Sequence, residues 1–133
     1  MTKTVLIADD DRVLRLIVGA VLTSDEYTVL AAEDGDEAWR SILDHRPTLA
    51  LLDVQMPGRS GLQLTAAIKN DPELAGTHVV LLTSKTQETD IRAGLAAGAD
   101  CYLTKPFSPL ELLTVVERAL AAAEPENSTA RAS

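Results

Sequence analysis

The hydrophobic pattern of this chain divides it into short apolar runs and longer segments of mixed polarity. The apolar runs, rich in Val, Leu and Ile, are Val5–Ala8, Thr28–Ala32, Leu49–Leu52, Val79–Leu82 and Cys101–Leu103. They do not alternate cleanly with polar residues, and strands buried on both faces of a parallel sheet have this pattern. The runs therefore predict five strands in a sheet that helices cover on both sides.

Helical periodicity marks the segments between these runs, and local signals mark the helix ends. The predicted helices are Arg12–Ser24, Gly35–His45, Leu62–Asn70, Thr86–Ala97 and a last one that follows Ser108 and ends near Ala123. The first places Val13, Leu14, Ile17, Val18, Val21 and Leu22 on one broad stripe, which is expected to face the core. Gly98 is placed as a C-terminal stop, and Ser108 with Glu111 forms a capping box.

Strands and helices alternate strictly, which predicts an α/β fold with an open, doubly wound, five-stranded parallel sheet and right-handed crossovers. A length of 133 residues suits one domain, expected at residues 1–123. Residues 124–133 contain only Glu, Pro, Asn, Ser, Thr, Ala and Arg, and we expect a disordered tail or a truncated linker there. Ligands of such sheets bind beyond the C-terminal ends of the strands.

Charge and composition exclude several classes of protein. With 12 basic and 20 acidic residues the net charge is −8, which argues against a direct nucleic-acid binder and against docking on anionic lipid. The single cysteine, Cys101, excludes an intramolecular disulfide and a multi-cysteine zinc site. No apolar run approaches the roughly 18 residues of a membrane span, and the N-terminus lacks the pattern of a signal peptide. A cytoplasmic protein with no membrane partner is expected.

Acidic residues stand at the ends of two predicted strands. Asp9 and Asp10 follow the first strand, and Asp53 follows the third. Because the ends of parallel strands meet at one edge of the sheet, these carboxylates would crowd together, and they must then hold a cation or protonate. Oxygen ligands without Cys or His favour a hard ion, and so few protein ligands suit Mg²⁺, which keeps its waters.

A hydroxyl and a lysine complete this edge. Thr83 ends the fourth predicted strand and Lys105 ends the fifth. A metal, a lysine and a hydroxyl around one carboxylate could cradle a phosphoryl group, and an aspartate can itself be the nucleophile. Each residue alone has a plainer explanation, such as a helix cap or a solvated lysine. Their combination, in order at consecutive strand ends, is far more specific.

The motifs around these residues resemble a known family, the receiver domain of two-component response regulators. The matching segments are Val5–Asp10, Leu51–Gly58, Leu82–Ser84, Ala97–Asp100 and Tyr102–Phe107, within a resemblance that covers roughly residues 3–122. The resemblance implies the flavodoxin-like strand order 2-1-3-4-5, which is the family's order. It also implies a phosphorylation-controlled switch, not an enzyme that acts on other substrates.

The resemblance implies a phosphoacceptor and a metal site. Asp53 would accept a phosphoryl group from a phosphohistidine on a sensor histidine kinase or a histidine phosphotransfer protein. Asp10, Asp53 and the main-chain carbonyl of Gln55 would ligate Mg²⁺ directly, and Asp9 would act mostly through a bound water. In this family the residues at the positions of Gln55 and Lys85 flank the path of hydrolytic water, so we expect both to shield the phosphoryl group partly.

The remaining motif residues would transmit the signal. The resemblance implies that Thr83 and Lys105 hold phosphoryl oxygens, and that Tyr102 is the aromatic switch residue that turns inward when Thr83 moves. It also implies a cis Lys105–Pro106 bond, and that Gly61 lets the loop after the acceptor turn.

Two other functions fit part of the pattern. An aspartyl-phosphate phosphatase of another α/β family usually has a second Asp two residues after its nucleophile, and this chain has Gln55 there. A flavodoxin-like cofactor carrier needs a hydroxyl-rich loop after the first strand, and here that loop is Asp9–Asp11, which would repel a phosphate.

The expected output surface comprises the fourth helix, fifth strand and fifth helix. One branch of the family, winged-helix transcription factors, forms dimers there through charged pairs. At three of the expected charged positions this chain has Ile91, Cys101 and Val115, and Leu112 and Val116 could add to an apolar patch. We expect hydrophobic contact with an unidentified effector, or a phosphorylation-dependent homodimer, in place of the charged dimer.

Overall fold

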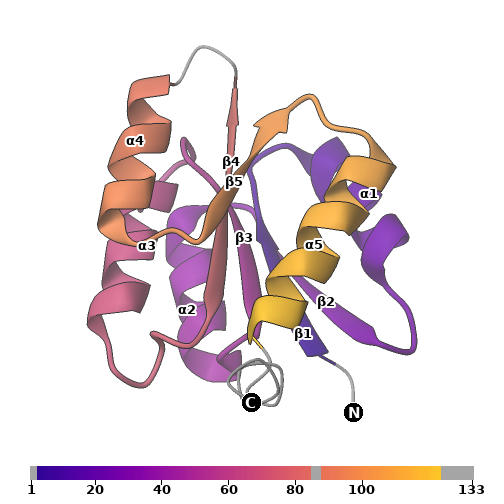
Figure 1. Ribbon diagram of the computed structural model, residues 1–133, viewed down its shortest axis with the longest axis horizontal. Coiled ribbons are helices and arrows are strands. Elements are labelled where there is room, and N and C mark those ends of the chain that lie inside the picture. The colour runs from indigo at the N-terminus through magenta and orange to yellow at the C-terminus, as the bar shows by residue number, and fades with distance from the viewer. Residues whose placement is uncertain (1–2, 85–87, 124–133) are drawn as a thin grey trace, which may run out of the picture.

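The chain folds around one five-stranded parallel sheet, seen nearly edge-on in Figure 1. A computed structural model describes residues 3–84 and 88–123. The strands are β1 (Lys3–Ala8), β2 (Tyr27–Ala32), β3 (Leu49–Asp53), β4 (His78–Ser84) and β5 (Cys101–Lys105). The helices are α1 (Arg12–Leu22), α2 (Gly35–His45), α3 (Gly61–Asn70), α4 (Glu88–Ala97) and α5 (Pro109–Ala123). The order β2-β1-β3-β4-β5, with all neighbours parallel, confirms the predicted doubly wound sheet.

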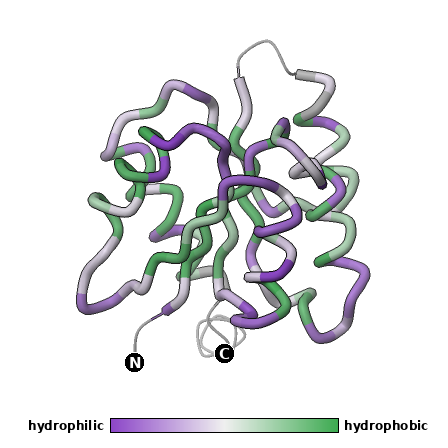
Figure 2. Tube along the Cα trace, turned by 180° about the vertical axis from the view of Figure 1, so that it is seen from behind, coloured by the Kyte–Doolittle hydropathy of each residue, from purple (hydrophilic) through white to green (hydrophobic). Residues whose placement is uncertain are grey.

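Two hydrophobic layers fill the space between the sheet and its helices. Alternate residues of β1 point to opposite faces, so Leu6 packs in the layer with α2 and α3, whereas Ile7 packs in the layer with α1 and α5. Figure 2 shows hydrophobic residues (green) concentrated in the strands at the centre of the molecule. Within residues 3–84 and 88–123, no helix has the length and apolar character needed to cross a lipid bilayer.

Two helix ends follow the predicted capping signals, and Asp11 provides a further cap. The Asp11 side chain accepts the backbone N–H of Val13 at 2.9 Å and so caps α1. Ser108 and Glu111 exchange the two hydrogen bonds of a capping box, at 3.0 and 3.1 Å. Gly98 follows α4 with a φ of 110°, as a C-terminal stop requires. The predicted helix start at Thr86 and the predicted tail at 124–133 lie outside the described residues.

The predicted core stripe of α1 is partly wrong. Val18 and Leu22 are buried, but Val13 is 62% exposed and Ile17 44%. α1 packs on β1, β2 and α5, and the stripe is wider than the helix face that meets these elements. The exposed residues belong to the first turns of α1, which lie near the edge of the sheet where the strands end (Figure 1).

The expectation that Leu112 and Val116 add to an exposed patch is also wrong. Both side chains are fully buried, in the layer between α5 and the sheet. They lie four residues apart, one helical turn, and therefore share the inner face of α5. Val115, on the neighbouring face, is half-buried.

Candidate functional site

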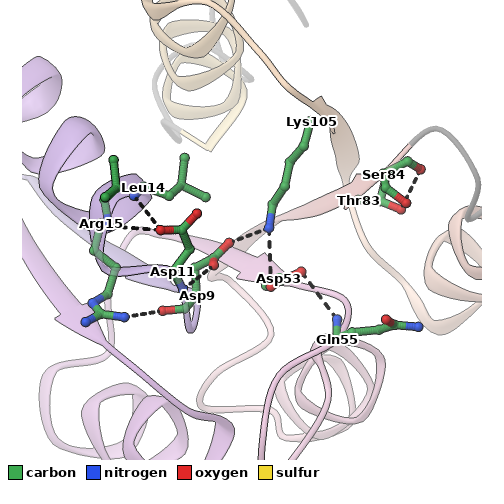
Figure 3. A network of polar contacts seen from close by, with 10 residues as sticks. Asp9, Asp11, Leu14, Arg15, Asp53, Gln55, Thr83, Ser84 and Lys105 are labelled. Carbon is green, nitrogen blue, oxygen red and sulfur yellow. Dashed lines mark hydrogen bonds and ion pairs between the residues drawn. The ribbon is translucent and has the colours of Figure 1, made fainter.

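The carboxyl ends of β1, β3 and β5 bring two aspartates and one lysine together, as predicted (Figure 3). The Lys105 ammonium lies 2.6 Å from Asp9 Oδ2 and 3.3 Å from Asp53 Oδ2. Burial alone would lower the pKa of Lys105, but the hydrogen bond that its ammonium donates to Asp9 and the charges of both carboxylates outweigh burial and raise that pKa. Lys105 therefore remains a fixed cation between the two carboxylates.

Asp53 lies at the centre of this arrangement. It ends the central strand, is only 6% exposed, and accepts the backbone N–H of Gln55 on Oδ1 at 3.3 Å. Burial, followed by the negative charge of Asp9, raises the pKa of Asp53 from 3.8 to about 6, although Lys105 opposes the shift. Asp53 is thus ionised at neutral pH and more basic than an ordinary aspartate, as a nucleophilic carboxylate should be.

Three carboxylates form a candidate metal site. One oxygen each of Asp9, Asp10 and Asp53 lies within 4.8 Å of the others. Asp9 is fully buried, and within the part of the chain that the structure describes its Oδ2 has no polar partner other than the Lys105 ammonium. Asp10 is exposed. A buried carboxylate oxygen beside an exposed one suits a hard cation that keeps some of its waters.

Of the other predicted site residues, Thr83 lies at the same edge of the sheet. Thr83 is 1% exposed at the end of β4, paired in register with Thr104, and its hydroxyl donates to the Ser84 carbonyl at 3.3 Å. Tyr102 lies on the edge strand β5 and is 44% exposed. The Gln55 side chain is exposed. Lys85, the second predicted shielding residue, lies outside the described residues.

The backbone around the site follows one expectation, and the structure gives its own reason for the glycine at position 61. The Lys105–Pro106 bond is cis. Gly61 begins α3, where a Cβ atom would stand 2.4 Å from the Asp53 carbonyl oxygen. Close approach to the backbone of Asp53 therefore requires glycine at this position.

Replacing Gly61 with alanine should destabilise the protein. The added methyl group cannot fit against the Asp53 carbonyl without a backbone shift, so we expect Gly61→Ala to lower the free energy of unfolding by about 1–3 kcal/mol. Urea unfolding measures the change. The control is Gly19→Ala in α1, where nothing lies within 4 Å of the added atom and a gain of about 0.5–1 kcal/mol is expected. Equal stability of Gly61→Ala and the wild type would contradict the argument.

The sequence did not single out three contacts of the loops around the site. Arg15, on α1, donates from Nη1 to the backbone carbonyl of Asp9 at 2.7 Å. The Arg59 guanidinium, in the loop after β3, lies over the Trp39 ring of α2 at 5.3 Å from its centroid. The same loop accepts the Gly35 N–H on the Pro57 carbonyl at 2.8 Å. These contacts tie the β1–α1 and β3–α3 loops to their neighbours. The only sequence signal for the hydrogen bond from Arg15 to the Asp9 carbonyl is weak: Arg15 lies about one helical turn after the Asp11 cap.

A model of the response regulator receiver domain family matches residues 5–117. This chain is a response regulator receiver domain. Phosphate regulon transcriptional regulatory protein PhoB of Pseudomonas aeruginosa is 38% identical to it over 128 residues, which cover 96% of this chain and 56% of PhoB. DNA-binding response regulator MtrA of Mycobacterium tuberculosis is 35% identical over 120 residues, which cover 90% of this chain and 51% of MtrA.

Solved structures give the same family. The chemotaxis response regulator CheY4 of Vibrio cholerae superimposes with a TM-score of 0.84 at 32% sequence identity, covering 90% of this chain and 100% of that one. The receiver domain thus spans about half the length of the two curated relatives and the whole of CheY4. Receiver domains are signalling domains of two-component systems and in general bind Mg²⁺ in an acidic pocket, where this chain has its aspartate cluster.

Proposed function

We propose that this receiver domain is a switch in which Asp53 accepts a phosphoryl group from a phosphohistidine on a sensor histidine kinase or a histidine phosphotransfer protein. The observation that carries the proposal is the Asp53 carboxylate itself, buried at the end of the central strand with the Lys105 ammonium at 3.3 Å. Incorporation of phosphate from a small-molecule phosphodonor, compared between the wild type and Asp53→Asn, tests it.

In the proposed reaction an Asp53 carboxylate oxygen attacks phosphorus. The bond between phosphorus and the donor's imidazole nitrogen breaks, and the nitrogen leaves with the electron pair. Lys105 and the Thr83 hydroxyl would hold oxygens of the transferred phosphoryl group. The positive charge of Lys105 and a hydrogen bond from Thr83 would stabilise the negative charge that develops on these oxygens. The domain consumes no other substrate and assists only its own phosphorylation and dephosphorylation.

The metal ion proposed for this site is Mg²⁺. Asp10, Asp53 and the main-chain carbonyl of Gln55 would hold it directly, with Asp9 acting mostly through a bound water. When bound, Mg²⁺ supplies a divalent charge that neutralises the phosphoryl oxygens. The three clustered carboxylates support the proposal, because their mutual repulsion favours a cation among them.

The phosphodonor is proposed to dock beside this site, on α1 and the β5–α5 loop. A cavity of about 430 Å³ opens there, lined by Asp11, Leu14, Ile17, Lys105, Pro106 and Phe107. Val13 and Leu16 of α1 and Leu110 of α5 are 62%, 61% and 72% exposed. An apolar surface that shares Lys105 with the acidic pocket would place the donor's histidine next to Asp53.

A charged substitution on the exposed apolar surface of α1 should impair docking of a protein phosphodonor without impairing the phosphorylation reaction itself. We expect Ile17→Glu to reduce phosphoryl transfer from a phosphorylated histidine phosphotransfer protein at least tenfold, because a buried carboxylate would lack a partner. Transfer from a small-molecule phosphodonor should not change. Leu43→Glu on α2, where the native side chain is similarly exposed at 46%, is the control. Equal losses in the two variants, or none in Ile17→Glu, would argue against docking at α1.

The output surface is proposed to comprise α4, β5 and α5, changed on phosphorylation through Thr83 and Tyr102. Ile91, Cys101 and Val115, all half-buried, make it more apolar than a surface built on charged pairs. The effector, or a second copy of the domain, would bind through hydrophobic contact. This remains the proposed alternative to the charged dimer of the winged-helix branch.

Salt dependence tests this surface. We expect phosphorylated protein to associate with little loss as salt rises, because salt screens charged pairs but not hydrophobic contact. Val115→Glu should abolish the association. Sedimentation velocity at low and high salt measures both effects. Dimers that form on phosphorylation and dissociate at high salt would point to charged pairs.

A further inference from the structure

Arg15 links the acidic pocket to the neighbouring strand end. It lies in the second turn of α1, and its side chain is 17% exposed. Nη1 donates to the Asp9 carbonyl at 2.7 Å, and Nη2 lies 3.9 Å from Glu33 Oε2, just after β2 (Figure 3 shows the first of these contacts). The short contact to the carbonyl is the stronger of the two, because Glu33 is 65% exposed and its ion pair is screened by water.

The carbonyl that Arg15 holds belongs to the peptide between Asp9 and Asp10. The peptide is planar, so a hydrogen bond to its oxygen also fixes the Asp10 nitrogen and Cα. Asp9 is also held by its N–H, which donates to the Ala32 carbonyl at 3.1 Å, by Oδ1, which accepts the Asp11 N–H at 2.9 Å, and by Oδ2, which lies 2.6 Å from the Lys105 ammonium. Asp10 therefore lies between Asp9 and Asp11, whose backbones are held by these hydrogen bonds. Arg15 fixes the plane of the Asp9–Asp10 peptide and with it the position of the Asp10 Cα atom, which carries the Asp10 side chain.

We propose that Arg15 is a positioning residue for the metal site, holding the Asp9–Asp10 peptide so that the Asp10 carboxylate faces Asp9 and Asp53. Arg15 acts only through the backbone. The inference rests on the proposed Mg²⁺ site. It accounts for the hydrogen bond that Arg15 donates to the main-chain oxygen of Asp9, whose side chain belongs to the carboxylate cluster.

The test measures Mg²⁺ affinity without phosphorylation. The midpoint of thermal unfolding, followed against Mg²⁺ concentration, gives the dissociation constant by linkage. We expect Arg15→Met to weaken Mg²⁺ binding about tenfold, the usual lower size of such outer-shell effects. Glu33→Gln, which removes the ion pair but leaves the bond to the Asp9 carbonyl, should bind Mg²⁺ within about twofold of the wild type.

Conservative replacement separates positioning from packing. Arg15→Lys keeps a long donor and should retain more affinity than Arg15→Gln, whose amide is too short to reach the carbonyl. This pair also decides the matter if Arg15→Met does not fold. The Arg15 variants could lower the midpoint of thermal unfolding without Mg²⁺ and still bind Mg²⁺ within about twofold of the wild type. That result would overturn the inference and leave the proposed metal site intact. A wild type that does not respond to Mg²⁺ would overturn the metal site itself.

Discussion

Asp53→Asn protein will incorporate no phosphate from a small-molecule phosphodonor and Mg²⁺, whereas the wild type will gain one phosphoryl group. The amide has the shape of the carboxylate but lacks the charge and the nucleophilic oxygen that an acyl phosphate requires. The pKa of Asp53, raised to about 6, leaves it ionised at neutral pH. Intact-mass measurement detects the added group, which should be stable in acid and labile in base. Chelation of Mg²⁺ should abolish the reaction.

The matched control for this experiment is Asp11→Asn. Asp11 lies in the loop between β1 and α1 and caps α1, and asparagine caps a helix as well as aspartate does. This variant should keep its phosphorylation. Equal incorporation by the wild type and Asp53→Asn would place the acceptor elsewhere in the chain.

In the metal-free protein, Asp53→Asn will instead be a stabilising substitution at pH 7. Burial and the charge of Asp9 raise the pKa of Asp53 from 3.8 to about 6 in the folded state. Between these values the folded protein binds more protons than the unfolded chain, so its stability falls as pH rises. Above pH 6, where Asp53 is ionised in the folded protein, the loss of folding stability caused by its raised pKa reaches its full value, on the order of 2–3 kcal/mol. Asp53→Asn removes the ionisable carboxyl group and should raise the free energy of unfolding by about 1–3 kcal/mol at pH 7.

Urea unfolding in EDTA at pH 4 and pH 7 measures this difference. The two proteins should have similar stability at pH 4, where Asp53 is protonated in the folded state, and differ at pH 7. Mg²⁺ supplies the control, because it should stabilise the wild type by about 2.7 kcal/mol at 100 times its dissociation constant, and Asp10→Ala should lose this response. No gap between the wild type and Asp53→Asn at pH 7 would contradict the electrostatic argument.

The convergence of Asp9, Asp53 and Lys105 could be predicted because it depends only on topology. Parallel strands end at one edge of the sheet, so residues that follow strands must meet there, and the apolar runs locate the strands. The same reasoning placed Thr83 at this edge. The direction of its hydroxyl, toward the Ser84 carbonyl, could not be predicted, because it depends on a rotamer.

Predictions failed where they depended on how a helix is rotated about its axis. The exposure of Val13 and Ile17 and the burial of Leu112 and Val116 follow from which face of α1 or α5 meets the sheet. A stripe on a helical projection is wider than that face, so periodicity alone does not identify its edges. The bond from Arg15 to the Asp9 carbonyl was missed for the same reason.

The stacking of Arg59 on Trp39 gives the domain an optical probe of its own. Trp39 is the only tryptophan of the chain, and Arg59 belongs to the loop that follows Asp53. A guanidinium above an indole changes the electrostatic environment of the ring, so we expect the emission of Trp39 to change when Arg59 moves relative to the ring. Ligand-induced rearrangement can thus be followed in unlabelled protein, and Arg59→Ala gives the reference spectrum of the uncovered ring.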